Sequence, residues 1–404
     1  MVTFSFKKII IIYVLIFLPI CDMVNGYLVV NGILTSGGIG SPSQIGRLVA
    51  IILFSIYIFK ERINIYWLGG ALLLLLLFEI HGALYLQSVI GFIFGVTNSY
   101  KIFYLITSLV VFSKIIDNRY YLIYFIKTLK INLYIVSGSI IIAFVFGIGN
   151  STYGWGSGTK GFFSSGNSLG IYIGSLAILY LSLYRYKLMK DYEFYLFLII
   201  PISLLFLSSK TALLLSAIIL LYWLIVSRFR YLIIPLFILF ISLYHNAILD
   251  KISVLFEVII SRYDNSADLF SFIASGRYGF VDNAFDIFYG SEPSILRYII
   301  GMGSFVSYQN VDSLYVTYDT LETDFFDIFF MYGIFGVISY IGLYIYIYIY
   351  TKSNKVWVLS LSLLFMHSLI AGHVIFNGMS CVALLSIFIL SKYLKEFYVV
   401  KKNI

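Results

Sequence analysis

Residues 195–226 read YLFLIIPISLLFLSSKTALLLSAIILLYWLIV, and this stretch decides the class of fold. Its only charged residue is Lys210, in the middle of the segment Ser-Ser-Lys-Thr. The apolar runs on either side approach the length that a helix needs to cross a hydrocarbon core about 30 Å thick. Backbone amides find no water in that core, so each run must satisfy its own hydrogen bonds as a helix. The stretch therefore predicts two transmembrane helices, 194–208 and 211–227, with a short polar turn between them.

The same pattern extends over the whole chain. Hydrophobic residues make up 61% of the sequence and charged residues 11%, against about 25% charged in an ordinary soluble domain. The hydropathy predicts one all-α polytopic membrane domain, 1–404, with about twelve transmembrane helices. Their expected positions are 9–25, 43–59, 64–80, 88–113, 131–149, 166–184, 194–208, 211–227, 231–247, 328–350, 356–372 and 374–391. Tyr and Ile alternate over 344–350 as in a strand, but this tract continues an apolar run, so we expect the end of a helix.

The basic residues indicate the orientation of the chain. Of the 27 Lys and Arg residues, 19 lie in short clusters between the apolar runs. This placement follows the positive-inside rule, and it argues against a nucleic-acid-binding protein despite the net charge of +8. With an even number of spans, both termini are expected in the cytoplasm. Lys7 and Lys8 precede the first span with no small-residue cleavage site after it, so we expect a retained anchor rather than a signal peptide.

This topology leaves one large external loop, 245–327. The loop holds 12 of the 19 acidic residues of the chain. Loops longer than about 12–15 residues are uncommon and are usually functional or disordered. The many Phe, Tyr and Ile residues argue against disorder. We therefore expect short helices that cap the membrane domain.

Two shorter polar segments are candidate ligand sites. Residues 154–167, GWGSGTKGFFSSGN, contain Lys160 as their only charge. Glycines permit close backbone approach to a ligand, although a flexible turn accounts for them as well. Lys210, at the outer mouth of a hairpin, either extends to the membrane interface or binds an anionic head group.

The long loop carries a third candidate site. Arg277 lies in the segment Ser275-Gly276-Arg277, and Glu322 and Asp324 lie in 322–327, ETDFFD, which runs directly into a span. Alternatively, the acids cap the positive end of the following helix, an effect of about 0.3–1 kcal/mol each. That alternative suits Asp327 best.

Histidine and cysteine indicate little chemistry. His373 lies at the predicted outer end of the eleventh span, where a structural role is the simpler interpretation. No pair of histidines has a metal-ligand spacing. Cys21 and Cys381 fall in apolar segments and imply no disulfide framework.

Several of these segments occur in a characteristic order. They are Asp22-Met23-Val24-Asn25-Gly26, Ser41-Pro42 before a span with Arg47, Lys160-Gly161-Phe162-Phe163 with Gly166-Asn167, Ser208-Ser209-Lys210-Thr211, Ser275-Gly276-Arg277, Glu322 to Asp327 with Tyr332-Gly333 and Gly336, and Gly372-His373. In order and placement the chain resembles the Wzy-type O-antigen and exopolysaccharide polymerases, which are similar to the O-antigen ligases.

The resemblance implies a GT-C-like glycosyltransferase in the bacterial inner membrane that acts at its periplasmic or outer face. Its substrate would be an undecaprenyl diphosphate-linked oligosaccharide, with no cofactor or metal and with a polysaccharide chain-length regulator as a possible partner. Cations at the interface would bind the diphosphate, for which arginine is well suited. The candidates are Arg277, supported by Lys210, Arg297 and Lys160. A carboxylate would serve as the base, with Glu322 as first choice and Asp324 as second, and His373 is a further candidate.

Other functions stay open. Ligases of this kind are expected to have a histidine near the end of the long loop, where this chain has Glu322, which favours a polymerase. The earlier loop offers only Lys160 where related polymerases are expected to use arginines. A flippase would be expected to show internal repeats and charges deep in its helices, and here Glu79 and Lys101 are the main examples. A non-catalytic scaffold would leave Arg277 and Glu322 without a purpose.

Overall fold

The computed structural model describes residues 5–34, 40–64, 66–86, 89–152, 158–227 and 320–398, and parts of 230–303 that include 268–274, 276–290 and 295–301. These residues are almost entirely helical, and their only β contact is an isolated bridge between Ser151 and Thr159. The helices are α1 (Phe6–Ile12), a π-helical segment (Tyr13–Phe17), α2 (Leu18–Val30), α3 (Pro42–Lys60), α4 (Tyr66–Leu86), α5 (Val89–Ile115), α6 (Arg119–Phe146), α7 (Gly166–Ser182), a 3-10 segment (Leu183–Tyr186), α8 (Asp191–Leu196), α9 (Ile199–Leu207), α10 (Lys210–Val226), α12 (Leu269–Ala274), α13 (Arg277–Gly290), α14 (Ile295–Ile300), α16 (Asp324–Thr351), α17 (Lys355–Ile370) and α18 (Gly378–Tyr398).

The prediction of an all-α membrane protein is confirmed. Among the described residues, seven helical stretches are long and apolar enough to cross a bilayer. They are Phe6–Val30, Pro42–Lys60, Gly91–Ile115, Arg119–Phe146, Gly166–Tyr186, Asp324–Thr351 and Gly378–Phe397. Three shorter apolar helices cover Tyr66–Gly82, Lys210–Val226 and Lys355–Ile370. The total of twelve spans stays a prediction, and the expected span 231–247 lies mostly outside the described residues.

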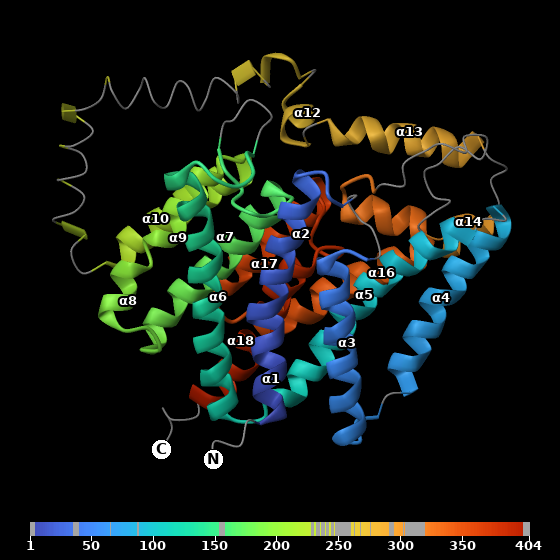
Figure 1. Ribbon diagram of the computed structural model, residues 1–404, viewed down its shortest axis with the longest axis horizontal. Coiled ribbons are helices and arrows are strands. Elements are labelled where there is room, and N and C mark those ends of the chain that lie inside the picture. The colour runs from blue at the N-terminus through green and yellow to red at the C-terminus, as the bar shows by residue number, and fades with distance from the viewer. Residues whose placement is uncertain are drawn as a thin grey trace.

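The helices form a bundle around α7 and α18 (Figure 1). Both of these helices are buried over nearly their whole length. Small residues let neighbours approach α7 closely, since a Cβ atom on Gly174 would lie 2.5 Å from the Leu215 side chain of α10. Close contact of this kind stabilises helix pairs in a bilayer, where lipid offers no hydrophobic driving force between helices.

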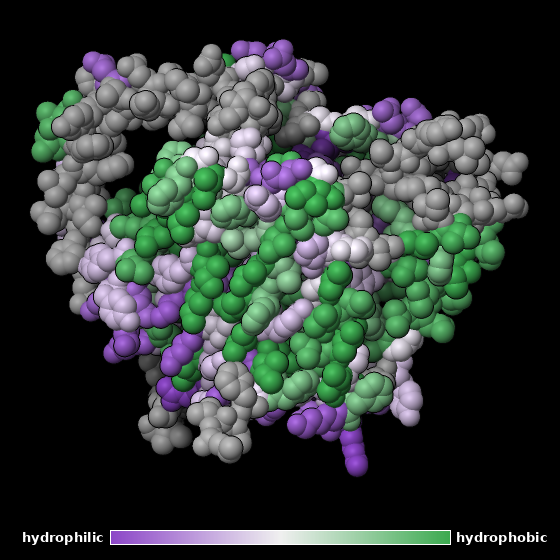
Figure 2. All heavy atoms as spheres, in the orientation of Figure 1, coloured by the Kyte–Doolittle hydropathy of each residue, from purple (hydrophilic) through white to green (hydrophobic). Residues whose placement is uncertain are grey.

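The outside of the bundle is apolar between its two ends. Figure 2 shows hydrophobic side chains along the helices of this face, with hydrophilic residues concentrated toward the ends. Phe59 and Phe146, for example, are 71% and 70% exposed. A soluble protein rarely exposes apolar surface of this extent, so the surface suits contact with lipid.

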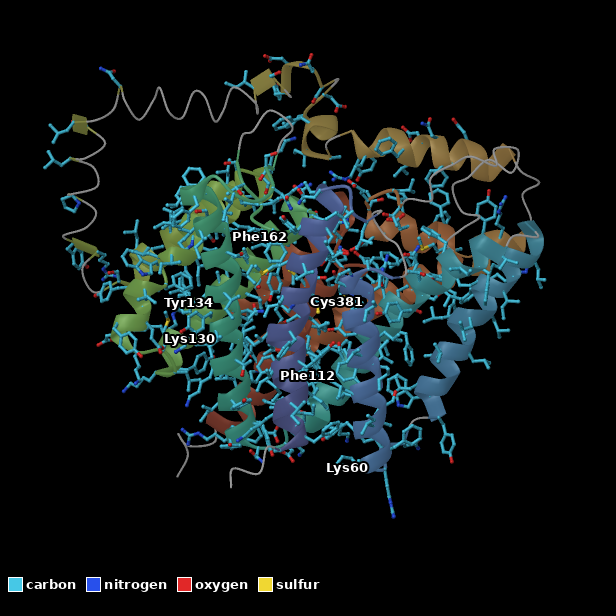
Figure 3. All side chains as sticks on the ribbon, in the orientation of Figure 1. Lys60, Phe112, Lys130, Tyr134, Phe162 and Cys381 are labelled. Atoms are coloured by element: carbon cyan, nitrogen blue, oxygen red, sulfur yellow. The ribbon has the colours of Figure 1, made fainter. Side chains whose placement is uncertain are left out.

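The two ends of the bundle differ. The start of α1 and the end of α18 both contact the turn between α5 and α6, where Lys7 pairs with Asp117 and the Tyr393 hydroxyl donates to the Ser113 carbonyl. Lys60 projects at the same end (Figure 3). Helices α12 and α13, from the segment predicted as the external loop, lie across the opposite end (Figure 1). The direction in which each end faces stays a prediction.

Two predicted helices differ clearly from the structure. Helix α6 begins at Arg119 rather than 131, because the Asn118 side chain caps it there. In addition, Lys130 points from α6 toward α8 and pairs with Glu193 (Figure 3), so its charge is satisfied within the helix bundle. The expected span 194–208 is divided into α8 and α9 by a turn ahead of Pro201. The tract 344–350 is helical, as predicted.

Helix α16 is broken at Gly333, which has φ +62° and ψ −158°. A Cβ atom here would lie 2.5 Å from the Ile299 carbonyl oxygen, so α14 packs directly on the break. Only glycine adopts this conformation readily and leaves room for the neighbouring backbone. The break and α14 thus fix the direction of the first nine residues of α16, which lead from the candidate site.

Candidate functional site

Arg277 and Glu322 form an ion pair at the start of α13 and just before α16. The Nε and Nη2 atoms of Arg277 donate to Oε2 of Glu322 at 2.9 and 2.5 Å. Arg277 is buried, whereas the Glu322 side chain is 40% exposed. A charge-assisted pair of this length is among the stronger hydrogen bonds in proteins. Two sequence-based candidates, 45 residues apart in the long loop, therefore meet in space.

His373 faces the other oxygen of Glu322. Its Nε2 atom lies 3.7 Å from Oε1, and its side chain is 26% exposed. Glu322 and His373 both have left-handed backbone angles, with φ of +58° and +61°. Non-glycine residues rarely adopt this conformation, and it is found preferentially at functional sites, at a cost of about 1–3 kcal/mol each.

The surroundings of Glu322 favour its ionised form. Hydrogen bonding to the His373 imidazole, followed by the charges of His373 and Arg277, lowers the pKa of the Glu322 carboxyl from 4.5 to about 2, against the opposing effect of burial. Glu322 is therefore a carboxylate throughout the physiological pH range. A base this weak accepts a proton poorly at neutral pH.

Asp324 holds the chain segment that carries His373. Its Oδ2 atom accepts hydrogen bonds from the Ser368 hydroxyl at 2.6 Å and from the backbone N–H groups of Val374 and Ile375 at 2.9 and 3.0 Å. Asp324 is fully buried, 1% exposed. A buried carboxylate with three donors is well satisfied, and it ties the beginning of α16 to the end of α17.

Gly372 brings the two segments into direct contact. A Cβ atom at this position would lie 2.5 Å from the Glu322 carbonyl oxygen, and the glycine has φ +61°. A side chain would therefore both strain residue 372 and displace Glu322. The glycine ahead of His373 accounts for the close approach of His373 to Glu322.

Lys210 and Arg277 both bind the C-terminal carbonyl groups of α12. Lys210 Nζ donates to the Phe272 carbonyl at 2.6 Å and lies 3.8 Å from the centre of its ring. Arg277 Nη1 donates to the Ala274 carbonyl at 3.3 Å. Cations are favourable at a helix C-terminus, where carbonyl groups lack intrahelical partners. Lys210 and Arg277 thus bind carbonyl groups of two nearby residues, Phe272 and Ala274, at the same end of α12.

Asp327 acts as a helix cap. Its carboxylate accepts from the backbone N–H groups of Leu321 and Thr323 at 2.8 and 3.3 Å, and it is buried. This agrees with the alternative interpretation of the acidic segment for Asp327. It does not apply to Glu322, whose side chain turns to Arg277 and His373.

Lys160 and Arg297 occupy other positions. The Lys160 backbone is bonded to Asn150, and burial lowers the pKa of its half-buried ammonium group. Its loop packs on the segment before Lys210, with Thr159 N–H donating to the Phe206 carbonyl at 2.8 Å. Residues 153–157 of the glycine-rich segment lie outside the described residues. Arg297 is buried on α14, the helix that packs on the Gly333 break.

The described residues contain no group of three or more His, Cys, Asp and Glu side chains that could hold a metal ion. Polar residues that the sequence analysis did not place in the site also line a cavity between α2, α3 and α5, among them Asn25, Gln44 and Lys101. The sequence could have indicated these residues, because a polar residue inside an apolar span is a functional candidate by default.

The chain matches no family model, no curated protein and no solved structure. The candidate site is therefore assigned from its own geometry.

Proposed function

We propose that this protein is a polysaccharide polymerase, a glycosyltransferase with a GT-C-like fold that transfers a polyprenyl diphosphate-linked glycan onto the next lipid-linked repeat unit. The product would be O-antigen, capsule or another exopolysaccharide. The observation that carries the proposal is the cluster of buried Arg277 with the partly exposed Glu322 and His373, at one end of a membrane bundle beside an apolar groove. Such a site suits a substrate with an anionic head group and a lipid tail.

The groove runs between α4, α5 and α16. Two cavities of about 530 and 510 Å³ share the lining residues Trp67, Ile106 and Leu343, so they lie next to each other along these helices. At one end the lining includes Ile375, whose backbone N–H is bound by Asp324. A polyprenyl chain in this groove would lead its diphosphate toward the candidate site.

Arg277 is the proposed diphosphate ligand. Its planar guanidinium group matches two phosphate oxygens at once, and in the structure the same edge donates to Glu322. As the bond between the sugar C1 and the phosphate oxygen breaks, negative charge develops on the departing lipid diphosphate. Arg277 would stabilise this charge in the transition state. Lys210 is then a positioning residue through α12, and Arg297 and Lys160 are further candidate cations.

Glu322 and His373 together form the proposed base. The acceptor hydroxyl oxygen forms a bond to C1, and its proton passes to the His373 imidazole, while the Glu322 carboxylate stabilises the resulting imidazolium. This modifies the sequence-based first choice of Glu322 alone, because a carboxyl group with a pKa of about 2 is a poor base. The Oδ2 atom of Asp324 already accepts three hydrogen bonds. We therefore assign Asp324 to holding the segment after His373 in place and not to accepting a proton.

The proposal places the protein in the bacterial cytoplasmic membrane, with α12 and α13 at the periplasmic or outer side and a chain-length regulator as a partner. The charge clusters support this direction. They predict a cytoplasmic location for the opposite end, where Lys7 and Lys60 lie.

The test is the lipid-linked glycan profile of cells that lack the protein. Accumulation of single repeat units supports a polymerase, long lipid-linked chains indicate a ligase, and material retained at the cytoplasmic face indicates a flippase. Complementation with Arg277→Lys should fail although the protein is inserted, because a point charge does not replace the planar group. Arg119→Lys, at the exposed start of α6, is the matched control and should restore normal polymer.

An O-antigen ligase is the second candidate, and His373 is the observation that favours it. The resemblance leads us to expect a ligase histidine near the end of the long loop, where this chain has Glu322, and here a histidine from the segment after α17 faces that residue. For a flippase, by contrast, the two deep charges have structural partners. Glu79 accepts from Ser99 and Tyr332, and Lys101 donates to Asn98 at 2.8 Å.

A further inference from the structure

A second polar site lies inside the bundle, away from the ion pair. It is a cavity of about 140 Å³ between α2, α3, α5, the loop 163–165 and the beginning of α18. Asp22, Asn25, Gln44, Arg47, Lys101 and Asn377 are among its lining residues. Polar groups are costly inside an apolar bundle unless they are paired, so this concentration requires an explanation.

The charged side chains of the cavity are only partly paired with each other. Arg47 Nη2 donates to the Ser43 hydroxyl at 3.0 Å and lies 3.9 Å from Asp22 Oδ1, and Ser43 in turn donates to Asp22. Arg47 is 7% exposed, and this is the only hydrogen bond that its guanidinium group makes within the described residues. Arg47 lines the cavity, so a ligand there would lie next to its guanidinium group.

Two of the residues that line the cavity each carry a buried acceptor atom with no partner in the described part of the chain. Oδ1 of Asn25 and Oε1 of Gln44 are buried and accept no hydrogen bond from the described part of the chain. Leaving a buried polar atom in this state is unfavourable. A ligand that donates hydrogen bonds as well as accepting them would suit these two amide side chains.

We propose that this cavity binds one sugar ring of the acceptor repeat unit, an inference that rests on the proposed polymerase function. A sugar hydroxyl both donates and accepts, so it would satisfy Asn25 and Gln44 together with Arg47. A phosphate would leave the two amide oxygens unpaired and would face the Asp22 carboxylate. The volume of about 140 Å³ suits a single ring.

The cavity and the ion pair share one short loop. His373 faces Glu322, and Asn377, four residues later, lines the cavity. Four residues span at most about 14 Å, a distance that one or two sugar rings cover. Cys381, which lies behind α2 and α3 in Figure 3, donates to the Ile375 carbonyl at 3.1 Å and holds this loop against α18. A ring in the cavity would thus direct the neighbouring acceptor hydroxyl toward His373.

The glycine-rich segment forms another wall. Asn150 donates to the Gly26 and Phe163 carbonyls at 3.3 and 3.1 Å, which joins α2 to the loop. Gly26 packs on the backbone of 162–164 with no room for a Cβ atom. The loop is thereby fixed beside the cavity, with Ser164 exposed at its edge.

The experiment measures binding of free monosaccharides to the purified full-length protein by saturation-transfer NMR. The probes are glucose, galactose, N-acetylglucosamine, rhamnose and, separately, inorganic pyrophosphate. At least one sugar should bind, with a dissociation constant raised roughly tenfold in Gln44→Leu, the effect of one hydrogen bond. Arg277→Lys should bind the sugar normally, since it alters the other site.

A second variant avoids the risk of misfolding. Ser164→Trp fills the cavity from an exposed loop position and should abolish sugar binding, whereas Ser353→Trp, on the exposed turn between α16 and α17, should not. Unchanged binding in Ser164→Trp, no binding of any sugar to the wild type, or pyrophosphate binding that Ser164→Trp abolishes would each overturn the inference. Loss of polymer in the deletion strain without sugar binding would overturn this inference alone. Normal polymer in that strain would instead remove the proposed function.

Discussion

Glu322 and His373 have the same left-handed backbone conformation and face each other, with His373 Nε2 at 3.7 Å from Glu322 Oε1. They come from segments on either side of α16 and α17, and each is held by the buried groups around it. The strain in both residues is maintained by Asp324, which binds the segment after His373, and by the contact at Gly372. Strain of this kind is stable only where the surroundings determine it fully.

Glu322→Gln should abolish polymer formation while the amount of protein in the membrane stays normal. The amide keeps the shape of the side chain but cannot stabilise an imidazolium or balance Arg277. General acid–base catalysis typically contributes about 10²–10⁴-fold to the rate, and the variant would leave the His373 imidazolium without its carboxylate partner. Polymer length on gels and immunoblots of membranes measure the two effects. Long chains from this variant would show that His373 works without the carboxylate.

Asp327→Asn should remain active. The amide oxygen still accepts one of the two hydrogen bonds from Leu321 and Thr323, and a lost cap costs about 0.5–2 kcal/mol. We expect a lower melting temperature in detergent with normal polymer length. An inactive but stable Asp327→Asn protein would contradict the structural role.

The Glu322 interaction should make stability depend on pH at the acid end. Because the folded protein lowers the pKa of this carboxyl from 4.5 to about 2, its contribution is complete above about pH 4.5 and is lost as the pH falls through about 2. The melting temperature of the wild type should fall between these values more steeply than that of Glu322→Gln. Parallel curves for the two proteins would refute the ion pair as a source of stability.

Gly372→Ala should destabilise the site. The methyl group would meet the Glu322 carbonyl, and the left-handed angle adds strain. Gly342→Ala in α16 is the matched control, because its methyl group meets nothing within 4 Å and a helix gains about 0.5–1 kcal/mol from the same change. We expect loss of polymer only in the first variant. Equal activity of both would mean that the contact at 372 is not required.

The predicted topology can be tested with single cysteines in a background without Cys21 and Cys381. A membrane-impermeant thiol reagent should label Asn265→Cys in intact cells. It should label Ser353→Cys, on the turn between α16 and α17, only after the membrane is opened. Both positions are exposed, so access alone decides the result. The opposite pattern would place the candidate site in the cytoplasm.

Hydropathy predicted most of the helices because each apolar run has only one stable form in a bilayer. Hydropathy missed helical residues where polar side chains extend a helix beyond its apolar run. In α6 (Arg119–Phe146) the N-terminal half carries Lys127 and Lys130. Lys130 is satisfied by Glu193, 63 residues away. Windowed hydropathy does not detect such a partner. The turn between α8 and α9 was easier to predict from the sequence, because proline is tolerated in the first turn of a helix but not in its interior, and Pro201 lies in the first turn of α9.

The residue types of the site were predictable, but their contacts were not. Arg277 and Glu322 were candidates from their place in the long loop, yet the bond between them spans 45 residues and follows no periodicity. The separation of roles between Asp324 and Asp327 depends on which backbone amides each carboxylate meets. Asn25 and Gln44 were visible only as polar residues in apolar spans.

The break at Gly333 has a mechanical consequence. A continuous helix as long as α16 would be rigid throughout, so any tilt imposed at its Thr351 end would move the site at its Asp324 end. The break divides it into two shorter helical parts, and α14 packs on the break. When the bilayer thins or thickens and the longer part after Gly333 tilts to match it, we expect the part before Gly333 to keep the direction set by its own contacts. The site would thereby be insulated from deformations of the membrane that surrounds it.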